Sequence, residues 1–189
     1  MNKAEARILS LNLRKKENKI KASNNIIEAL IKSNILNNFK KVGIYYPIGN
    51  EIDIMPLINY YKNIEFYLPK TEDEISFIKY DGLLIDGPFK TKEPVGEIIK
   101  RDSIECFIIP CVAISKDLKR LGYGKGYYDR YLNDYKGLKI GICYNDVANL
   151  DIEMDSFDVK LDKIFIGWYY GNCNFIDGWS WPKNEKRYK

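Results

Sequence analysis

Two long apolar stretches constrain the fold of this 189-residue chain more than any other feature. Residues 106–115 read CFIIPCVAIS, and residues 138–145 read LKIGICYN. Neither stretch alternates between apolar and polar residues, so each is expected to be a strand that is buried on both faces. Such strands are typical of parallel sheets that are covered by helices. The two stretches therefore predict a mainly parallel sheet.

Four further segments are rich in β-branched and aromatic residues and end at turn-forming residues, which predicts strands. They span residues 41–49, 65–70, 75–80 and 163–170. Residues 81–100 are interrupted by Gly and Pro and are expected to be mostly loop.

Helices are expected in two regions. Residues 3–35 carry apolar residues at helical spacing without a proline, which predicts one long helix or two shorter ones. Residues 52–61 are also helix-like, with Asp53 as a candidate cap before Pro56. Strands separated by helical segments indicate a three-layer α/β domain, and the chain length suits one domain.

Histidine is absent from the sequence, which removes the usual acid–base group near neutral pH and the commonest metal ligand. Proton transfer would have to use a carboxylate, Lys, Tyr or the substrate itself. The net charge of +4 is mild, and the basic residues are interspersed with acidic ones. This balance fits an anionic small molecule as readily as nucleic acid.

The cysteines indicate a reducing compartment. Cys106, Cys111, Cys143 and Cys173 have no C-x-x-C spacing, and three of them lie in apolar runs. They are expected to be buried free thiols and not zinc ligands or disulfides. The longest apolar run is too short to span a bilayer, and the N-terminus lacks the apolar core of a signal peptide. These features predict a cytoplasmic protein.

Residues 120–132, RLGYGKGYYDRYL, combine glycines with cations after an apolar strand and before a helix-compatible segment at 127–135. Three glycines allow backbone N–H groups to approach an anion, a helix start would add partial positive charge, and Arg120 and Lys125 add full charges. The segment is no Walker loop, because Gly126 follows Lys125, and it does not fit the dinucleotide fingerprint. It predicts an anion cradle, with a mobile surface loop as the alternative on the glycines alone.

The acids and tyrosines near this segment each leave two interpretations open. Asp129 would either favour the helix dipole or bind Mg²⁺ beside a phosphate. Asp158 and Asp162, before the last predicted strand, would be solvated acids or a second source of metal ligands. Four tyrosines lie at helical spacing and would pack in the core: Tyr127, Tyr128, Tyr131 and Tyr135. Tyr127 and Tyr128 could stack on a flat heterocycle instead.

The segment RLGYGKGYYDRYL resembles the signature of the 5-formyltetrahydrofolate cyclo-ligase (methenyltetrahydrofolate synthetase) family. Other segments agree with the family in order and spacing: KAEAR from residue 3, YPIGNEID from 46, KEP from 92 and DVKLDKI from 158. The similarity covers residues 3–166. One departure is Phe157, which stands where many relatives carry His.

The resemblance implies a three-layer α/β sandwich of the NagB/RpiA/CoA-transferase-like type, formed by residues 1–166. Residues 167–189 would then be an aromatic extension packed on or beside this domain. Its tryptophans, Trp168, Trp179 and Trp181, would cover part of the domain, with partner binding as the alternative.

The resemblance also implies the activity. ATP would phosphorylate the formyl oxygen of 5-formyltetrahydrofolate in the presence of Mg²⁺, and N10 would then attack the activated carbon. The products would be 5,10-methenyltetrahydrofolate, ADP and phosphate. The partners would be these small molecules, without nucleic acid or membrane, and the protein would be a monomer or a weak homodimer.

Carried over by position, the resemblance implies roles for four sets of residues. Lys125 and Arg120 would be catalytic. ATP would contact Lys3, Arg7, Arg120, Leu121, Gly122, Tyr123, Gly124, Lys125, Gly126, Tyr127 and Tyr128. The folate would contact Tyr46, Glu51, Tyr123, Gly124, Lys125, Gly126 and Tyr127. Mg²⁺ would be bound by Asp129 and Asp162.

Two other functions fit part of the pattern. Another α/β enzyme that acts on a phosphorylated small molecule, such as a sugar-phosphate isomerase or an acyl-transfer relative, would explain the glycine-rich segment. It would not explain the joint presence of Lys3, Arg7, Glu51 and the two acids. An RNA-binding module would use basic and aromatic residues, but it predicts a concentrated basic stripe, against which the interspersed acids argue.

Overall fold

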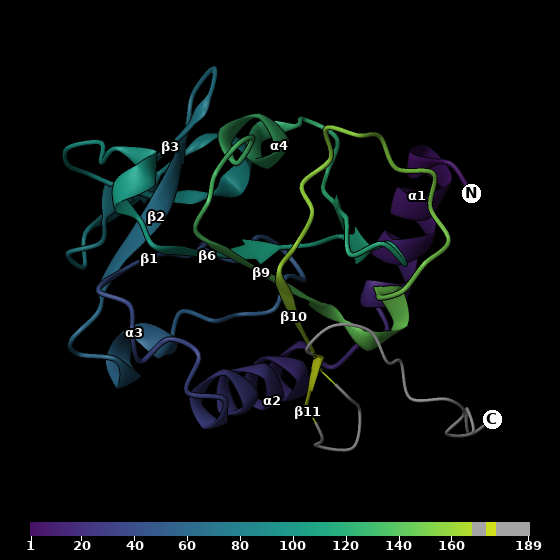
Figure 1. The fold of residues 1–189 in the computed structure, drawn as a ribbon, viewed down its shortest axis with the longest axis horizontal. Helices are drawn as coiled ribbons and strands as arrows, with labels where there is room; N and C mark the ends of the chain where they lie inside the picture. The colour runs from purple at the N-terminus through teal and green to yellow at the C-terminus, as the bar shows by residue number, and fades with distance from the viewer. Residues whose placement is uncertain (168–172, 177–189) are drawn as a thin grey trace.

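The computed structural model describes residues 1–167 and 173–176, and within them seven strands form one central sheet (Figure 1). The strand order is β11-β10-β9-β6-β1-β2-β3. The strands are β1 (Lys41–Gly43), β2 (Glu65–Thr71), β3 (Ile75–Lys79), β6 (Cys106–Pro110), β9 (Leu138–Tyr144), β10 (Lys163–Gly167) and β11 (Cys173–Ile176). The inner strands from β10 to β2 are parallel, whereas β3 and β11 are antiparallel to their neighbours. The predicted mainly parallel sheet is confirmed.

The centre of the sheet consists of the two apolar stretches that predicted it. Strands β6 and β9 pair in parallel from Cys106 opposite Leu138 to Pro110 opposite Ile142. The first four residues of β6 are buried, as are the last five of β9. The stretch 106–115 is not one strand, however. It breaks after Pro110 and continues as β7 (Ala113–Ile114), which pairs with β8 (Arg120–Leu121). This hairpin brings the glycine-rich segment to the end of β6.

Residues 3–35 form two helices, α1 (Lys3–Arg14) and α2 (Lys19–Lys32). The side chain of Asn2 caps α1 by accepting from the backbone N–H groups of Ala4 and Glu5, and Glu5 completes a capping box. The side chain of Asn18 caps α2. Asparagine is among the best N-cap residues, which explains why the chain restarts a helix at residue 19.

The other helices are short: α3 (Leu57–Tyr60), α4 (Tyr127–Tyr131), η1 (Pro88–Lys90), η2 (Arg101–Ser103) and η3 (Asn145–Val147). The helix predicted over 52–61 is thus limited to its last part. Asp53 does not cap it, because its Oδ1 accepts from Met55 N–H at 2.9 Å in a local turn. Within the predicted loop 81–100, β4 (Leu84–Asp86) and β5 (Lys92–Pro94) form a two-stranded sheet. The strand predicted over 41–49 is confined to β1.

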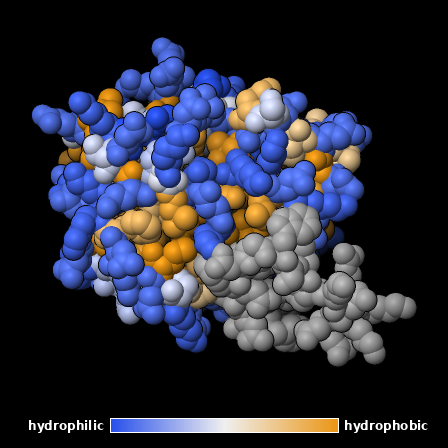
Figure 2. Space-filling view, in the orientation of Figure 1, coloured by the Kyte–Doolittle hydropathy of each residue, from blue (hydrophilic) through white to orange (hydrophobic). Residues whose placement is uncertain are grey.

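The helices lie on both sides of the sheet: α2 and α3 on one side and α4 on the other (Figure 1). Hydrophilic side chains cover much of the face in Figure 2, around a limited apolar patch. Among the described residues, no helix is long and apolar enough to cross a lipid bilayer.

Cys106, Cys111 and Cys143 are buried free thiols, as predicted, and burial raises the pKa of Cys111 to about 12. The side chain of Cys173 and the tryptophans Trp168, Trp179 and Trp181 lie outside the residues whose side chains are described. The expectation that the aromatic extension covers the domain or binds a partner stays a prediction. Its residues 173–176 pair with β10 as an antiparallel strand.

Candidate active site

A pocket of about 480 Å³ lies at the carboxyl ends of three parallel strands. Tyr45 and Tyr46 follow β1, Thr71 ends β2, and Pro110 ends β6, and all four residues line the pocket. The carboxyl edge of a parallel sheet is the usual position of a ligand site in α/β folds. All but one of the predicted site residues line this pocket: Lys3, Arg7, Tyr46, Glu51, Arg120, Leu121, Gly122, Tyr123, Gly124, Lys125, Gly126, Tyr127, Tyr128 and Asp129.

The glycine-rich segment forms one wall of the pocket. Gly124 has φ +102° and Gly126 has φ +67°, both in the left-handed region that favours glycine. A Cβ atom on Gly124 would also lie 3.3 Å from Cζ of Arg7. The helix predicted over 127–135 is shorter in the structure: α4 has five residues and ends at Tyr131. A single turn adds little dipole, so the positive potential comes mainly from side chains.

Arg120 is a buried cation at the base of this wall. Its side chain is held in place because Nε donates to the carbonyl oxygen of Pro110 at 2.8 Å, and its Cζ lies 4.7 Å from the ring centre of Tyr128. The backbone N–H of Arg120 donates to the carbonyl oxygen of Val159 at 2.9 Å. Lys125, in contrast, is exposed at the pocket and lies between two glycines. The site thus combines one buried guanidinium, held by its contacts with Pro110 and Tyr128, with one exposed ammonium group.

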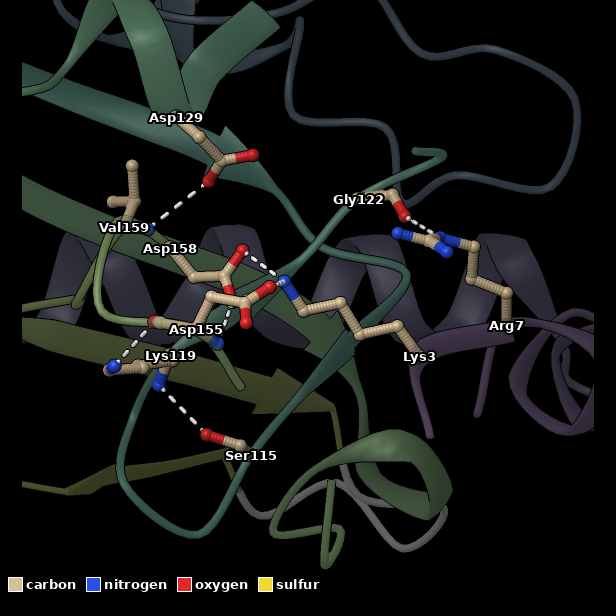
Figure 3. A network of polar contacts seen from close by, with 9 residues as sticks. All are labelled: Lys3, Arg7, Ser115, Lys119, Gly122, Asp129, Asp155, Asp158 and Val159. Carbon is tan, nitrogen blue, oxygen red and sulfur yellow. Dashed lines mark hydrogen bonds and ion pairs between the residues drawn. The ribbon is translucent and has the colours of Figure 1, made fainter. Parts of the chain in front are cut away.

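Helix α1 places two more cations at the pocket, one helical turn apart. Arg7 Nε donates to the carbonyl oxygen of Gly122 at 2.8 Å, which ties α1 to the glycine-rich wall (Figure 3). Lys3 Nζ lies 2.6 Å from Asp155 Oδ2 and 2.7 Å from Asp158 Oδ1. Although burial lowers the pKa of Lys3, its bonds to these carboxylates raise it above its ordinary value overall, so Lys3 is a cation.

The structure separates the two predicted metal ligands, Asp129 and Asp162. Asp129 lines the pocket, but Asp162 does not. Asp162 is exposed next to the start of β10, where its Oδ2 accepts from Lys139 N–H at 2.8 Å and lies 2.9 Å from Lys139 Nζ. Because the strands are parallel, their starting edge is opposite the pocket edge. The second aspartate that lines the pocket is Asp158, four residues before Asp162.

Asp129 and Asp158 are suited to bind a hard cation. Asp129 Oδ1 accepts from Val159 N–H at 3.1 Å, and Asp158 Oδ2 accepts from Asp155 N–H at 2.6 Å (Figure 3). Among the described residues, no group of three or more Asp, Glu or Cys side chains is arranged to hold a metal. Two carboxylates match a Mg²⁺ ion that takes its other oxygen ligands from water and phosphate groups.

Glu51 is a buried carboxylate that also lines the pocket. It is 4% exposed, and its Oε2 accepts from Ile48 N–H at 2.9 Å within the tight turn after β1. Burial raises the pKa of the Glu51 carboxyl, whereas the Ile48 N–H and the guanidinium groups of Arg14 and Arg120 oppose that rise. Arg14 was not among the predicted site residues, although it lies on the same face of α1 as Lys3 and Arg7.

The KEP segment supports the pocket wall. Glu93 is buried, and its Oε1 accepts from Thr71 N–H at 3.0 Å and from the hydroxyl of Thr91 at 3.3 Å. Thr71, Thr91 and Lys92 line the pocket. Glu93 therefore fixes the ends of β2 and β5 against each other and does not itself line the pocket. The resemblance to the family marked the KEP segment but did not predict this supporting role for Glu93.

The tyrosines of the motif divide between the two predicted roles. Tyr135 is buried in the core, and the ring of Tyr131 lies 5.3 Å from that of Phe77. Tyr127 and Tyr128 line the pocket, although Tyr128 is also buried beneath Arg120. Phe157 adds an aromatic ring at the pocket; it is 68% exposed and lies 5.2 Å from Lys3 Nζ.

Comparison with known proteins identifies consistent relatives. The model of the 5-formyltetrahydrofolate cyclo-ligase family matches residues 6–167. The chain is 36% identical over 130 residues to a 5-formyltetrahydrofolate cyclo-ligase of Mycoplasma pneumoniae, covering 66% of this chain and 71% of that protein. It is 33% identical over 130 residues to the Mycoplasma genitalium protein of that name, with the same coverage.

Solved structures agree with these sequence matches. The structure of 5,10-methenyltetrahydrofolate synthetase from Aquifex aeolicus is similar with a TM-score of 0.80 and 31% identity, covering 97% of this chain and 96% of that chain. The structure of a 5,10-methenyltetrahydrofolate synthetase from Mycoplasma pneumoniae has a TM-score of 0.72 and 31% identity, covering 87% and 98%.

Proposed function

The chain belongs to the 5-formyltetrahydrofolate cyclo-ligase family, and we propose that it uses ATP and Mg²⁺ to convert 5-formyltetrahydrofolate to 5,10-methenyltetrahydrofolate, ADP and phosphate. The observation that carries the proposal is the composition of one pocket. A wall of cations and backbone amides from residues 120–126 is joined there by a buried carboxylate, Glu51. The first group suits the phosphates of ATP, and the second suits N–H donors of a reduced pterin.

The reaction needs activation of a poor leaving group, because the formyl oxygen is an amide oxygen. When the γ-phosphoryl group is transferred to this oxygen, the bond between the γ-phosphorus and ADP breaks, and a phosphate ester of the formyl oxygen forms. The N10 lone pair then attacks the formyl carbon to close the ring. The N10 proton is released, and the carbon–oxygen bond breaks, so phosphate leaves with the former formyl oxygen.

The residues of the pocket serve this chemistry by position and charge. Arg120 is held at Pro110 and Tyr128, so its guanidinium is preorganised toward phosphoryl oxygens. Lys125, on the exposed segment between two glycines, can follow the transferred group. Phosphoryl transfer depends mainly on positioning and charge neutralisation, which agrees with a site that lacks histidine.

Asp129 and Asp158 would hold Mg²⁺, whereas Lys3 and Arg7 would contact ATP. A bound Mg²⁺ ion supplies charge neutralisation on the phosphates. Lys3 already pairs with Asp158 and Asp155 in the protein, so it can keep a carboxylate partner when Asp158 binds a cation. Tyr46 and Tyr127 line the pocket and would contact the folate rings, with Glu51 orienting them.

The direct test is to mix the purified protein with 5-formyltetrahydrofolate, ATP and Mg²⁺ and to follow the absorbance of the conjugated methenyl product. We expect a rise that needs all three components, with ADP and phosphate released in equal amounts to the product. A folded protein that gives no rise would refute the proposed reaction. Phosphate release without folate turnover would instead indicate an ATPase that acts on another substrate.

A further inference from the structure

Helix α1 carries a third cation that does not line the pocket. Lys3, Arg7 and Arg14 are spaced so that they share one face of the helix, since steps of four and seven residues bring the chain round to nearly the same side. The first two line the pocket. Arg14, at the end of the helix, is 3% exposed. A fully buried arginine needs a partner to offset the cost of removing its charge from water.

Arg14 binds the turn that carries Glu51. Its Nη2 donates to the carbonyl oxygen of Asn50 at 3.1 Å, and the side-chain amide of Asn50 donates back to the carbonyl oxygen of Arg14. The hydroxyl of Tyr144 donates to the same Asn50 oxygen at 3.0 Å, and Arg14 Cζ lies 5.8 Å from the Tyr144 ring centre. The end of α1 and the Glu51 turn are therefore fixed to each other.

The guanidinium is not satisfied by these contacts alone. Among the described residues, its Nε and Nη1 groups are buried without a hydrogen-bond partner. Buried donors that are left unpaired destabilise the folded protein, and a purely structural clamp would not need to retain them. The charge therefore calls for an explanation beyond the bond to Asn50.

Tyr123 connects Arg14 to the pocket. It lines the pocket together with Glu51. Burial raises the pKa of Tyr123, Glu51 adds to that rise and Arg14 opposes it, so the three side chains lie close enough to interact.

We propose that Arg14 is a positioning residue for the folate: it fixes the turn of Asn50 and Glu51 from behind, aims the Glu51 carboxylate into the pocket and places a positive charge near it. The inference rests on the proposed function, because it assigns Glu51 to folate binding. Arg14 itself touches no substrate in this scheme. The assignment extends the cationic face of α1 from the nucleotide side of the pocket to the folate side.

The electrostatic surroundings of Glu51 support this role. The charged and titratable groups that act on Glu51 are Arg14, Arg120, Tyr45, Cys111, Tyr123, Tyr128 and Tyr144. Only the two arginines in this set carry charge near neutral pH. Burial raises the pKa of Glu51, and both arginines oppose that rise. Without Arg14, Glu51 would accept a proton at a higher pH and would then present one acceptor fewer to a pterin.

Three single variants separate this role from a clamp on the turn. Arg14→Met removes the charge and keeps an unbranched apolar stem, whereas Arg14→Lys keeps the charge and loses the planar fork. Lys19→Met is the matched control, because Lys19 Nζ donates to the carbonyl oxygen of Gly49 at 2.8 Å in the same turn. Lys19 is only half-buried, whereas Arg14 is 3% exposed.

In the Arg14→Met protein we expect the folate KM to rise about tenfold or more, which corresponds to about 1.4 kcal/mol, with the ATP KM changed by less than about twofold. The folate defect should grow as the pH is lowered, since Glu51 is protonated at a higher pH once Arg14 no longer opposes the effect of burial. Arg14→Lys should keep a pH profile near that of the wild type. Lys19→Met should leave the folate pH profile unchanged.

The decisive comparison is a double-mutant cycle with Glu51→Gln, in which folate binding is measured by fluorescence titration without ATP. If Arg14 acts through Glu51, adding Arg14→Met to Glu51→Gln should weaken folate binding by less than about twofold. An additive loss would overturn the proposal, and so would parallel increases of the folate and ATP KM values without a pH shift.

Two further points keep the test decisive. If Arg14→Met does not fold, Arg14→Lys in the same cycle replaces it, with a smaller folate-specific defect expected and an additive loss again as the refuting result. Failure of the proposed function would look different, because the wild-type protein would then lack methenyl formation. Loss of the Arg14 effect in an active wild-type enzyme would refute the inference alone.

Discussion

Replacement of Asp158 by asparagine should weaken the binding of Mg²⁺ in the proposed reaction, whereas the same change at Asp162 should not. Both acids lie in one short stretch, DVKLDKI, and both are followed within a few residues by β10. Asp158 lines the pocket and is 8% exposed, but Asp162 is exposed at the opposite edge of the sheet. Asparagine preserves the size of the side chain and one acceptor oxygen, so the change removes mainly a negative charge.

The expected magnitude follows from this geometry. Two unit charges about 4 Å apart interact by ~1 kcal/mol in water, so removing one carboxylate weakens the binding of a divalent cation by roughly 2 kcal/mol at a solvated site. This corresponds to a ~30-fold increase in the Mg²⁺ concentration that gives half-maximal rate. Asp158 is nearly buried and less screened, so its loss should be at least this large. For Asp162→Asn we expect less than about a twofold change.

The assay is methenyl formation at saturating ATP and folate, titrated with Mg²⁺, for the wild type and for Asp129→Asn, Asp158→Asn and Asp162→Asn. Lys3 retains Asp155 as a partner in the Asp158 variant, so thermal unfolding should reveal little loss of stability. Equal Mg²⁺ curves for the Asp158 and Asp162 variants would refute the reasoning. A large shift for Asp162→Asn alone would restore the pairing that the sequence suggested.

Three other outcomes are expected. Lys125→Ala should lower kcat by at least about a hundredfold because charge neutralisation at the phosphoryl group is lost, while Lys136→Ala, an exposed control, should leave kcat within about twofold. Because burial raises the pKa of Glu51, the folate affinity of the wild type should begin to fall at a higher pH than protonation of an exposed glutamate would cause. Glu51→Gln should make the folate affinity less dependent on pH. Identical pH profiles of the wild type and the variant would contradict this expectation. A thiol reagent should leave Cys106, Cys111 and Cys143 unreacted in the native protein and label all three in denaturant, since they are buried.

The sequence was a good guide where one physical signal dominates. Two-faced apolar runs can hardly be anything but inner strands, and β6 and β9 lie where those runs predicted. Glycine between cations signals a close approach of the backbone to an anion, and residues 120–126 do form a pocket wall. The two helices of residues 3–35 follow from the apolar spacing and from the capping asparagines.

The failures occur where position depends on tertiary structure. Asp158 and Asp162 are chemically equivalent in sequence, and only the direction of β10 decides which one faces the pocket. One usable signal was that Asp162 directly precedes a parallel strand and so belongs to the starting edge. Arg14 was missed because a lone arginine near a helix end reads as a solvated residue, although its spacing from Lys3 and Arg7 marks a shared face.

The ion pair between Lys3 and Asp158 closes a loop of the chain that is 155 residues long. A second closure joins Arg7 to Gly122 across the same pocket. Contacts so distant in sequence form slowly, because closing a long loop costs conformational entropy before the contact can stabilise the fold. During synthesis, the first helix would leave the ribosome long before its partners exist. The pocket is therefore expected to form late, and a nascent chain that stops short of Asp158 would lack this wall residue and the ion pair that holds Lys3.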